Sequence, residues 1–573
     1  MVSRKEIPQE ILESIEREAL LNAVRHDGKA DKKAVLGRVL GQHGSLRSDS
    51  AGTAALVGEV VDEVNAMSPE AQASTLDRKF PGSSVPEEKQ GRSGLPPLKS
   101  ATSGKAVFRL PPEPSGFMTI GHAMAFNINF LYKEMYHGKL WLRFEDTNPR
   151  KAAKKYYENF RRGIEWLGIS CDAEKNVSDD VELLYGYGKK MVESGDAYAC
   201  SCDPARVKAL RFEGKACEHR DSTPAASLRI WDELISKKHP EGAFVIRFRG
   251  DLTSLDYSLR DPNIFRIIDH PHTLTGTKYT LWPTYDLANT IEDEICGVTH
   301  VLRSSEFHND LQRHIRERLG LKPVEVVQFS RFNFKGTPVG KRLLRPLVEQ
   351  GLVSGWDDPR MPTVDAVRRR GLLPEALRQF TLQVGYTKSE HEYDWSLLYA
   401  VNRKLLDPFS RRLFFVPEPV KVEISGAPEK EVVLRLHPDK DMGDRRIQTG
   451  GTFFLPGGDL AGMSSGAKFR LIDLYNVELT SAGEDAKARY AGDELIPDTK
   501  KLQWVTPDSI KVSVTVTGPL FDDNGEFEKS SIKEVEGLVE KSFSDLKVGD
   551  IVQFPRFGFC RLDSPGRLIL AHR

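Results

Sequence analysis

Four side chains that bind soft metal ions lie within one short segment of the sequence. Cys200 and Cys202 form a Cys-x-Cys pair, and after 14 further residues Cys217 and His219 form a Cys-x-His pair. Thiolates and an imidazole at such paired spacings suit a tetrahedral zinc ion. The alternative is two buried cysteines beside a surface histidine. We favour zinc, and we predict a structural role because four protein ligands leave no open coordination position.

A second candidate site is an anion-binding loop in VFRLPPEPSGFMTIGHA. Arg109 leaves a predicted strand, residues 111–116 form a turn, and Gly121 and His122 open a helix. Glycine permits close backbone approach, and the first turn of a helix offers unpaired N–H groups to an anion. The alternative is an ordinary connection between a strand and a helix.

Further cations and polar groups follow along the chain. Lys341 and Arg342 end the segment FNFKGTPVGKR and could neutralise charge on an anionic leaving group; the alternative is a solvated basic turn. Tyr285 and Asn289 are four residues apart, which places both on one face of a helix. Three arginines at 368–370 could contact an RNA backbone or form a solvated helix face, and the sequence favours the two interpretations equally.

The elements that must position these residues change in character along the chain. Residues 1–80 show the three- and four-residue apolar spacing of helices, and 81–105 are rich in Pro, Gly and Ser, which predicts a linker. Strand and helix patterns then alternate from AVFRL to KKYYENFRRGIEWLG, which predicts a parallel α/β sheet. Helical spacing returns at 360–405. From about 410 the pattern is all-β, which predicts one or two barrels.

Composition narrows the class of protein further. A chain of 573 residues is long enough for several domains, and its 82 basic and 82 acidic residues give no net charge that would indicate a partner. Six cysteines are too few for a disulfide framework at this length. The sequence has no signal peptide and no apolar run of the roughly 20 residues that span a bilayer. We therefore expect a soluble cytoplasmic protein that does not bind membranes.

The loop sequence resembles the signature of class I aminoacyl-tRNA synthetases for glutamate and glutamine, in which P-P-E-P-S/N-G precedes H-I-G-H. Three further segments are similar to that family: LWLRFEDTNPRKA, WPTYDLANTIEDEICGVTHVLRSSE and NRKLLDPFSRRLFFV. The resemblance covers roughly residues 105–573 and is strongest to the glutamyl enzymes of archaeal and eukaryotic type. It implies a Rossmann-like parallel sheet with an acceptor-binding insertion, a helical stem-contact region and C-terminal β-barrels.

The resemblance also implies a role for each candidate residue. The catalytic residues would be His122, Lys341 and Arg342, and the ATP-binding residues would be Thr119, Gly121, His122, Lys341 and Arg342. The amino-acid site would comprise Arg109, Glu113, Glu145, Tyr285, Asn289 and Arg303. Within it, Glu145 would hold the α-ammonium group, and arginine suits the second carboxylate because its planar fork binds carboxylates in two places.

Three positions depart from the family pattern. Thr119 stands where the signature has its first histidine, and in the K-M-S-K-S-type loop Pro338 and Gly340 replace a lysine and the serine. These changes motivate one alternative, a tRNA-binding paralogue with impaired catalysis. The other alternative is a glutaminyl-tRNA synthetase. Ser115 argues against that enzyme, because glutaminyl enzymes typically have asparagine there, and so does the zinc motif.

The sequence thus predicts ATP-dependent charging of tRNA(Glu) with glutamate, with tRNA(Gln) as a second candidate substrate. Mg²⁺ would accompany ATP, Zn²⁺ would be structural, and the protein would be a monomer. The expected organisation comprises an N-terminal helical region (1–80), a linker (81–105), two halves of the catalytic domain (106–199 and 281–350), an insertion with the zinc site (200–280), a stem-contact region (351–408) and anticodon-binding barrels (409–573).

Overall fold

The computed structural model describes residues 8–25, 28–43, 46, 49–80, 94–307, 309–483 and 485–573. The chain divides into two compact units, Met1–Ser93 and Gly94–Arg573, which are described separately below. Most of the predicted linker, residues 81–93, lies outside the described residues. Its remaining part packs onto the second unit, since Leu95 and Leu98 are buried in the core of that unit.

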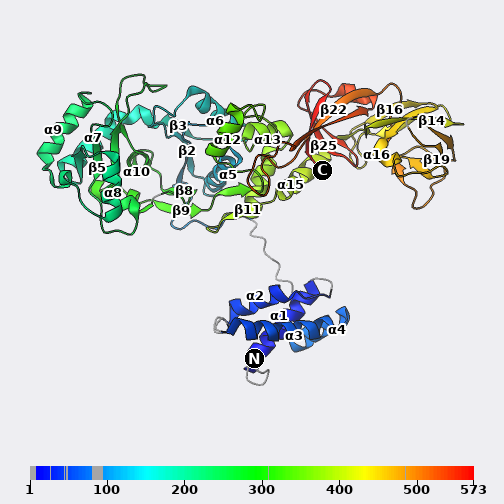
Figure 1. Ribbon diagram of the computed structural model, residues 1–573, viewed down its shortest axis with the longest axis horizontal. Helices are drawn as coiled ribbons and strands as arrows, with labels where there is room; N and C mark the ends of the chain where they lie inside the picture. Colours follow the sequence, from blue (N-terminus) through cyan, green and yellow to red (C-terminus); the bar gives the residue numbers. More distant parts are fainter. Residues whose placement is uncertain are drawn as a thin grey trace. The chain divides into compact units, whose positions relative to one another are not determined.

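The first unit consists of helices around a small apolar core (Figure 1). Leu20, Val57 and Leu76 are buried at the centre, on the faces that the apolar spacing of the sequence defines. Asp31 and Ser68 each accept a hydrogen bond from the backbone N–H of the third residue of the helix that follows, so each caps its helix. The helices are α1 (Gln9–Arg25), α2 (Lys32–Gln42), α3 (Ser50–Asn65) and α4 (Pro69–Lys79).

The second unit is built on parallel strands. Strands β1 (Val107–Leu110), β2 (Lys139–Phe144) and β3 (Ala173–Asn176) form one parallel sheet, and β8 (His300–Ser304) and β9 (Glu325–Phe329) form another. The Thr299 amide donates to the Val107 carbonyl at 3.0 Å, which brings the start of β8 beside β1. The associated helices are α5 (Ile120–Met135), α6 (Lys154–Trp166), α10 (Tyr285–Ile295) and α11 (Asn309–Leu319). The carboxyl ends of β1, β2 and β8 therefore carry the loops that can form a site.

An insertion separates the two groups of parallel strands in sequence. It is an antiparallel sheet in the order β4-β5-β6-β7 with an apolar core around Trp231 and Phe265, into which α10 and α11 also pack. Its strands are β4 (Ala197–Cys200), β5 (Val245–Phe248), β6 (Asn263–Ile267) and β7 (Leu281–Pro283), and its helices are α7 (Val181–Glu193), α8 (Pro204–Glu213) and α9 (Pro224–Ile235).

A mostly helical region follows the parallel strands. Val364, Val367, Leu377 and Leu398 from this region are buried in the same core as β1 and β2, so the region packs directly onto the parallel sheet. Its helices are α12 (Lys341–Glu349), α13 (Val364–Arg370), α14 (Pro374–Val384) and α15 (Trp395–Leu406), and its short strands are β10 (Phe332–Phe334) and β11 (His391–Tyr393).

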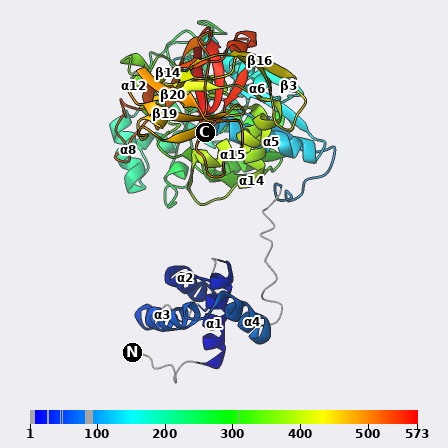
Figure 2. The same cartoon turned by 90° about the vertical axis from the view of Figure 1, so that its right-hand side faces the viewer.

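The C-terminal part of the chain forms two large sheets, which face the viewer in Figure 2. Alternating burial along strands such as β14 shows that each sheet has one face on a core and one in solvent. The seven-stranded sheet contains β12 (Arg411–Arg412), β13 (Phe415–Pro417), β22 (Ile510–Thr517), β23 (Ile532–Val539), β24 (Ile551–Phe554), β25 (Gly558–Ser564) and β26 (Arg567–His572).

The six-stranded sheet contains β14 (Pro419–Ser425), β17 (Thr452–Pro456), β18 (Lys468–Leu471), β19 (Asn476–Ser481), β20 (Asp485–Tyr490) and β21 (Lys501–Leu502). A hairpin of β15 (Lys430–Arg435) and β16 (Asp444–Thr449) and the short helix α16 (Gly457–Leu460) complete the region. The two large sheets form half-barrels, and together with the parallel catalytic sheet they confirm the predicted fold class. Among the described residues, no helix combines the length and apolar character needed to cross a bilayer.

Candidate functional site

Arg109 lies at the carboxyl end of β1 and is fully buried, with 0% of its surface exposed. Its Nε donates a hydrogen bond of 2.9 Å to Oδ1 of Asp293, and its Nη2 donates one of 3.4 Å to Oδ1 of Asn289. Both partners come from α10, which the chain reaches only after the whole insertion. A guanidinium group buried without a carboxylate would be strongly destabilising, so Asp293 is what allows Arg109 to lie here.

Glu145 follows β2 and lies beside Arg109. Its Oε1 accepts hydrogen bonds from Nε of Arg143 at 2.7 Å and from Nδ2 of Asn289 at 3.1 Å. Asn289 therefore bridges the two charged residues that the sequence assigned to the amino-acid site. Its amide donates to the carboxylate of Glu145 and its carbonyl accepts from Arg109.

Tyr285 and Arg303 complete the same group. Tyr285 begins α10, so it lies one turn from Asn289, and burial raises the pKa of its hydroxyl to about 12. Arg303 is on β8 and donates from Nη1 to Gln312 at 2.8 Å and from Nη2 to Asn309. Burial, followed by the like charge of Arg109, lowers the pKa of Arg303, although the nearby Tyr285 hydroxyl acts in the opposite direction. The structure thus brings five of the six predicted amino-acid residues together around Arg109.

Glu113, the sixth, belongs to a different group of contacts. Its carboxylate accepts a hydrogen bond of 2.6 Å from the Ser115 hydroxyl and pairs with Lys151 at 3.3 Å. The Ser115 hydroxyl in turn accepts 2.7 Å from Nζ of Lys341. A Cβ added at Gly116 would lie 2.8 Å from Cε of Lys341, so a larger residue here would require the lysine side chain to shift. The basic segment that contains Lys341 and the predicted anion-binding loop that contains Ser115 are therefore in direct contact.

His122 lies in the first turn of α5, packed against Phe126 and Phe160. The Thr119 amide donates to Nδ1 at 3.1 Å, and the Thr119 hydroxyl lies 2.8 Å from the same atom. Because Nδ1 accepts from the amide, the proton of the neutral ring is on Nε2. Desolvation, then the positive charge of Lys341, lowers the pKa of His122 to about 3. Thr119 therefore contacts His122 and fixes its tautomer.

The remaining residues of the nucleotide side lie around this turn. A Cβ added at Gly121 would make only ordinary contacts, with Thr119 and Val339 among the nearest neighbours, so in this structure glycine is not sterically required. Gly340 caps α12, and Lys341 begins the helix. Arg342 is exposed, whereas Lys341 is half-buried. The structure thus places only one of the two predicted cations against the signature loop.

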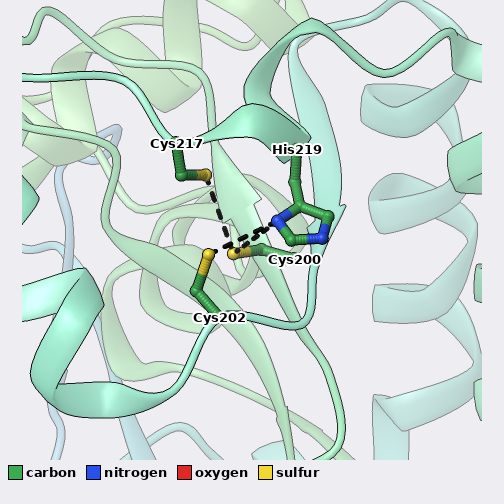
Figure 3. Close-up of side chains that lie close together, drawn as sticks. All are labelled: Cys200, Cys202, Cys217 and His219. Carbon is green, nitrogen blue, oxygen red and sulfur yellow. Dashed lines mark hydrogen bonds between the residues drawn. The ribbon is translucent and has the colours of Figure 1, made fainter.

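Cys200, Cys202, Cys217 and His219 form one compact cluster (Figure 3). Their ligand atoms all lie within 4.8 Å of one another. The two sulfurs of Cys200 and Cys217 are 3.9 Å apart, and Nδ1 of His219 lies 3.4 Å from the sulfur of Cys202. Metal–sulfur bonds of about 2.3 Å in a tetrahedron place sulfur atoms about 3.8 Å apart, so the donor set fits zinc in both chemistry and spacing.

Residues that sequence reasoning did not single out support this cluster. Arg247 donates from Nη1 to the sulfur of Cys217 at 3.5 Å and from Nε to the carbonyl of Asp261 at 3.0 Å. The Asp261 carboxylate accepts from Tyr198 at 2.9 Å and from Arg220 at 2.8 Å. A positive guanidinium group beside thiolates offsets their charge and orients them, as groups around metal ligands commonly do.

Arg143 and Asp293 are likewise functional candidates that the sequence analysis missed. The sequence carried a signal for Arg143 and for Arg247, because each is a charged residue inside a largely apolar strand, KLWLRF and VIRF. A buried charge in a strand must have a partner, so such a position indicates either an ion-pair network or a site.

The arginines at 368–370 do not act as one group. Arg370 is buried, with its guanidinium 4.6 Å from the centre of the Trp395 ring, and Arg369 pairs with Asp563 of the C-terminal sheet at 2.7 Å. Arg368 is exposed and lines a groove of about 540 Å³ together with Phe117 and Trp356. Of the three, Arg368 is the exposed one, so its guanidinium group is the most accessible to an RNA backbone.

Known families match almost the whole second unit. The catalytic-domain model of class I tRNA synthetases (E and Q) matches residues 105–408, and two anticodon-binding-domain models of the same class match residues 410–491 and 501–563. The chain is 39% identical to the glutamate–tRNA ligase of Nitrosopumilus maritimus over 99% of this chain and 100% of that relative. It is 40% identical to that of Cenarchaeum symbiosum, over 97% and 98%, and 37% identical to that of Pyrococcus furiosus, over 95% and 96%. The chain belongs to the class I tRNA synthetases for glutamate and glutamine.

Proposed function

We propose that this protein attaches glutamate to the 3′ end of tRNA in an ATP-dependent reaction. The observation that carries the proposal is the buried group of Arg109, Glu145, Asn289 and Arg303, which offers two guanidinium groups and one carboxylate to a small molecule. Two cations suit the two carboxylates of glutamate, and the carboxylate suits its ammonium group. Relatives of nearly full length are named glutamate–tRNA ligases, which does not favour the glutaminyl alternative.

The reaction takes two steps. In the first, an α-carboxylate oxygen of glutamate attacks the α-phosphorus of ATP, the bond to the bridging oxygen breaks, and pyrophosphate leaves with its electron pair. In the second, a ribose hydroxyl at the tRNA terminus attacks the carbonyl carbon of the mixed anhydride, loses its proton, and AMP leaves. Both steps depend on positioning and charge stabilisation, and neither requires a nucleophilic side chain.

The residues of the nucleotide side have separate tasks in this proposal. The Nε2–H of neutral His122 donates a hydrogen bond to a phosphate oxygen, since its Nδ1 is already held by Thr119. Lys341 leaves Ser115 and stabilises the negative charge on the departing pyrophosphate. Arg342 has no phosphate contact in this proposal, because its side chain is exposed, and the role that the sequence predicted for it would require the loop to rearrange. ATP brings Mg²⁺ as its counter-ion.

The other regions would recognise the tRNA. The insertion contacts the acceptor end, residues 351–408 contact the stem, and the C-terminal half-barrels bind the anticodon, a role that matches the descriptions of the two family models there. Cys200, Cys202, Cys217 and His219 would hold a structural Zn²⁺, which fixes the fold of the insertion. The monomeric state, the cytoplasmic location and the charging of tRNA(Gln) stay predictions from the sequence.

Aminoacylation tests the proposal directly. Purified protein is incubated with ATP, Mg²⁺, labelled glutamate or labelled glutamine, and either tRNA(Glu) or tRNA(Gln). We expect labelled glutamate on tRNA(Glu), and label on tRNA(Gln) would add the second substrate. Attachment of glutamine alone would make the protein a glutaminyl enzyme. Folded protein that binds tRNA and attaches neither amino acid would overturn the proposal and favour the tRNA-binding paralogue.

A further inference from the structure

One carboxylate joins three guanidinium groups beneath the amino-acid site. Oδ1 of Asp293 lies 2.9 Å from Nε of Arg109 and 2.9 Å from Nη2 of Arg143, and its Oδ2 lies 3.4 Å from Nη2 of Arg316. Asp293 is only 1% exposed. Burial alone would raise the pKa of this carboxyl, but the three positive charges outweigh burial and lower the pKa below its ordinary value. Asp293 is therefore a charged counter-ion at neutral pH.

The sheet register brings the two central arginines to the same side. Arg109 on β1 pairs with Trp141 on β2, and Arg143 is two residues further along β2. Residues two apart on a strand point to the same face, and paired residues of neighbouring parallel strands do so too. Without an anion between them, two adjacent buried guanidinium groups would repel each other, so Asp293 is what permits this arrangement.

The contacts leave one donor of Arg109 available. Its Nε and Nη2 are occupied by Asp293 and Asn289, whereas the buried Nη1 has no hydrogen-bond partner among the described residues. An unpartnered buried donor costs free energy unless a ligand satisfies it. The Asp293 contact sets the rotation of the guanidinium plane, and thereby the direction in which Nη1 points.

Arg143 orients Glu145 in the same way as Asp293 orients Arg109. Its Nε donates a hydrogen bond of 2.7 Å to Oε1 of Glu145, while its Nη2 forms an ion pair with Oδ1 of Asp293 at 2.9 Å, without the geometry of a hydrogen bond. Arg143 thus uses two different nitrogens of its rigid guanidinium plane to connect Glu145 with Asp293. Glu145 would bind the ammonium group of the substrate, and Asp293 holds Arg109. A lysine could carry the charge but could not span both partners, because it has a single nitrogen.

We propose that Asp293 and Arg143 are a positioning pair that sets the orientation of both Arg109 and Glu145 toward the amino-acid substrate. The pair touches the reacting molecule only through these two residues. This inference rests on the proposed function, in which Arg109 and Glu145 bind glutamate. It extends that function by naming residues that control amino-acid binding without contributing to the ATP site.

Steady-state aminoacylation of tRNA(Glu) by Asp293→Asn tests the pair, because asparagine preserves the shape and removes the charge. We expect the KM for glutamate to rise at least tenfold, while the KM for ATP changes less than about threefold. Glu540→Gln is the matched control. Glu540 is also buried and pairs with Arg445 at 2.8 Å, but it belongs to the C-terminal region. It should leave the KM for glutamate within twofold.

Arg143→Lys is the second variant and carries the test if Asp293→Asn does not fold. It should also raise the KM for glutamate much more than the KM for ATP, since the charge of lysine without the two nitrogens of arginine does not restore glutamate binding. An unchanged KM for glutamate in either folded variant would overturn the inference, as would an equal rise in both KM values. Failure of the unmodified protein to charge glutamate would count against the proposed function instead. If that protein charges glutamine, the KM for glutamine in the same variants tests the pair.

Discussion

The amino-acid site and the Cys/His cluster are both groups of polar side chains inside the second unit, but the chain assembles them differently. The Arg109–Asp293 contact joins residues 184 positions apart, whereas all four donors of the cluster lie between residues 200 and 219. The cluster can be recognised because its spacing is local. The ion network is formed only when two strands and a distant helix pack together. The comparison teaches that short-range spacing identifies candidate ligands, and that long-range packing decides which charges face each other.

The largest effect is expected at the centre of the long-range site. Arg109→Lys keeps the charge but loses the fork that holds Asp293 and Asn289 together, so both a substrate contact and a buried ion pair are impaired. Breaking a buried pair costs about 3–5 kcal/mol. We expect kcat/KM for glutamate to fall about a thousandfold in aminoacylation assays. Arg313→Lys, at an exposed position on α11, should change it less than twofold; equal losses in the two variants would contradict this assignment.

Removal of one side chain of the Cys/His cluster should lower the metal content and the rate of tRNA charging more than the rate of amino-acid activation. Cys217→Ser leaves three donors, and we expect bound zinc, measured by mass spectrometry or elemental analysis, to fall from about one ion per chain to a small fraction. We expect tRNA charging to fall about a hundredfold because the insertion loses its fixed shape. Cys171→Ser, a partly buried cysteine outside the cluster, is the control. Full zinc content in Cys217→Ser would refute the metal assignment.

Lys341 and Arg342 are adjacent in one motif, yet only Lys341 makes a long-range contact with the signature loop. Lys341 contacts Ser115 across 226 positions, whereas its neighbour Arg342 is exposed. We expect Lys341→Ala to lower kcat ten- to a hundredfold with little change in the KM for glutamate, since its charge acts on the leaving group. Arg342→Ala should lower kcat less than threefold. Equal effects of the two changes would mean that the loop rearranges before the reaction.

The smallest effect concerns stability and pH. His122 has its pKa lowered from 6.5 to about 3 by desolvation and by Lys341, so the folded protein binds this proton less readily than the unfolded chain. Its contribution to stability is therefore full above about pH 6.5 and is lost as the pH falls toward 3. His122→Asn keeps an acceptor for the Thr119 amide but does not titrate. We expect the thermal midpoint of this variant to fall less between pH 7 and pH 5 than that of the unmodified protein. Parallel midpoints would show that His122 titrates normally.

Several features could be predicted from sequence alone. The alternation of strand and helix patterns after residue 105 and the change to β patterns at about 410 correspond to the parallel sheet and the half-barrels, because periodicity reports which face of an element is buried. Tyr285 and Asn289 lie one turn apart on α10, as their spacing indicated. Glu113 was placed in the amino-acid site by its motif, yet here it contacts Ser115 and Lys151, since a turn can direct neighbouring side chains to different sides.

Local order in the sequence by itself determined the Cys/His donor cluster, the signature loop and the succession of elements. Only the tertiary structure decided which buried charges meet. It placed Asp293 between Arg109 and Arg143, separated Lys341 from Arg342, and assigned three adjacent arginines to a core, an ion pair and a groove. The physical reason is that a buried charge is tolerated only beside a partner, and that partner is selected by the packing of strands and helices that lie far apart in the chain.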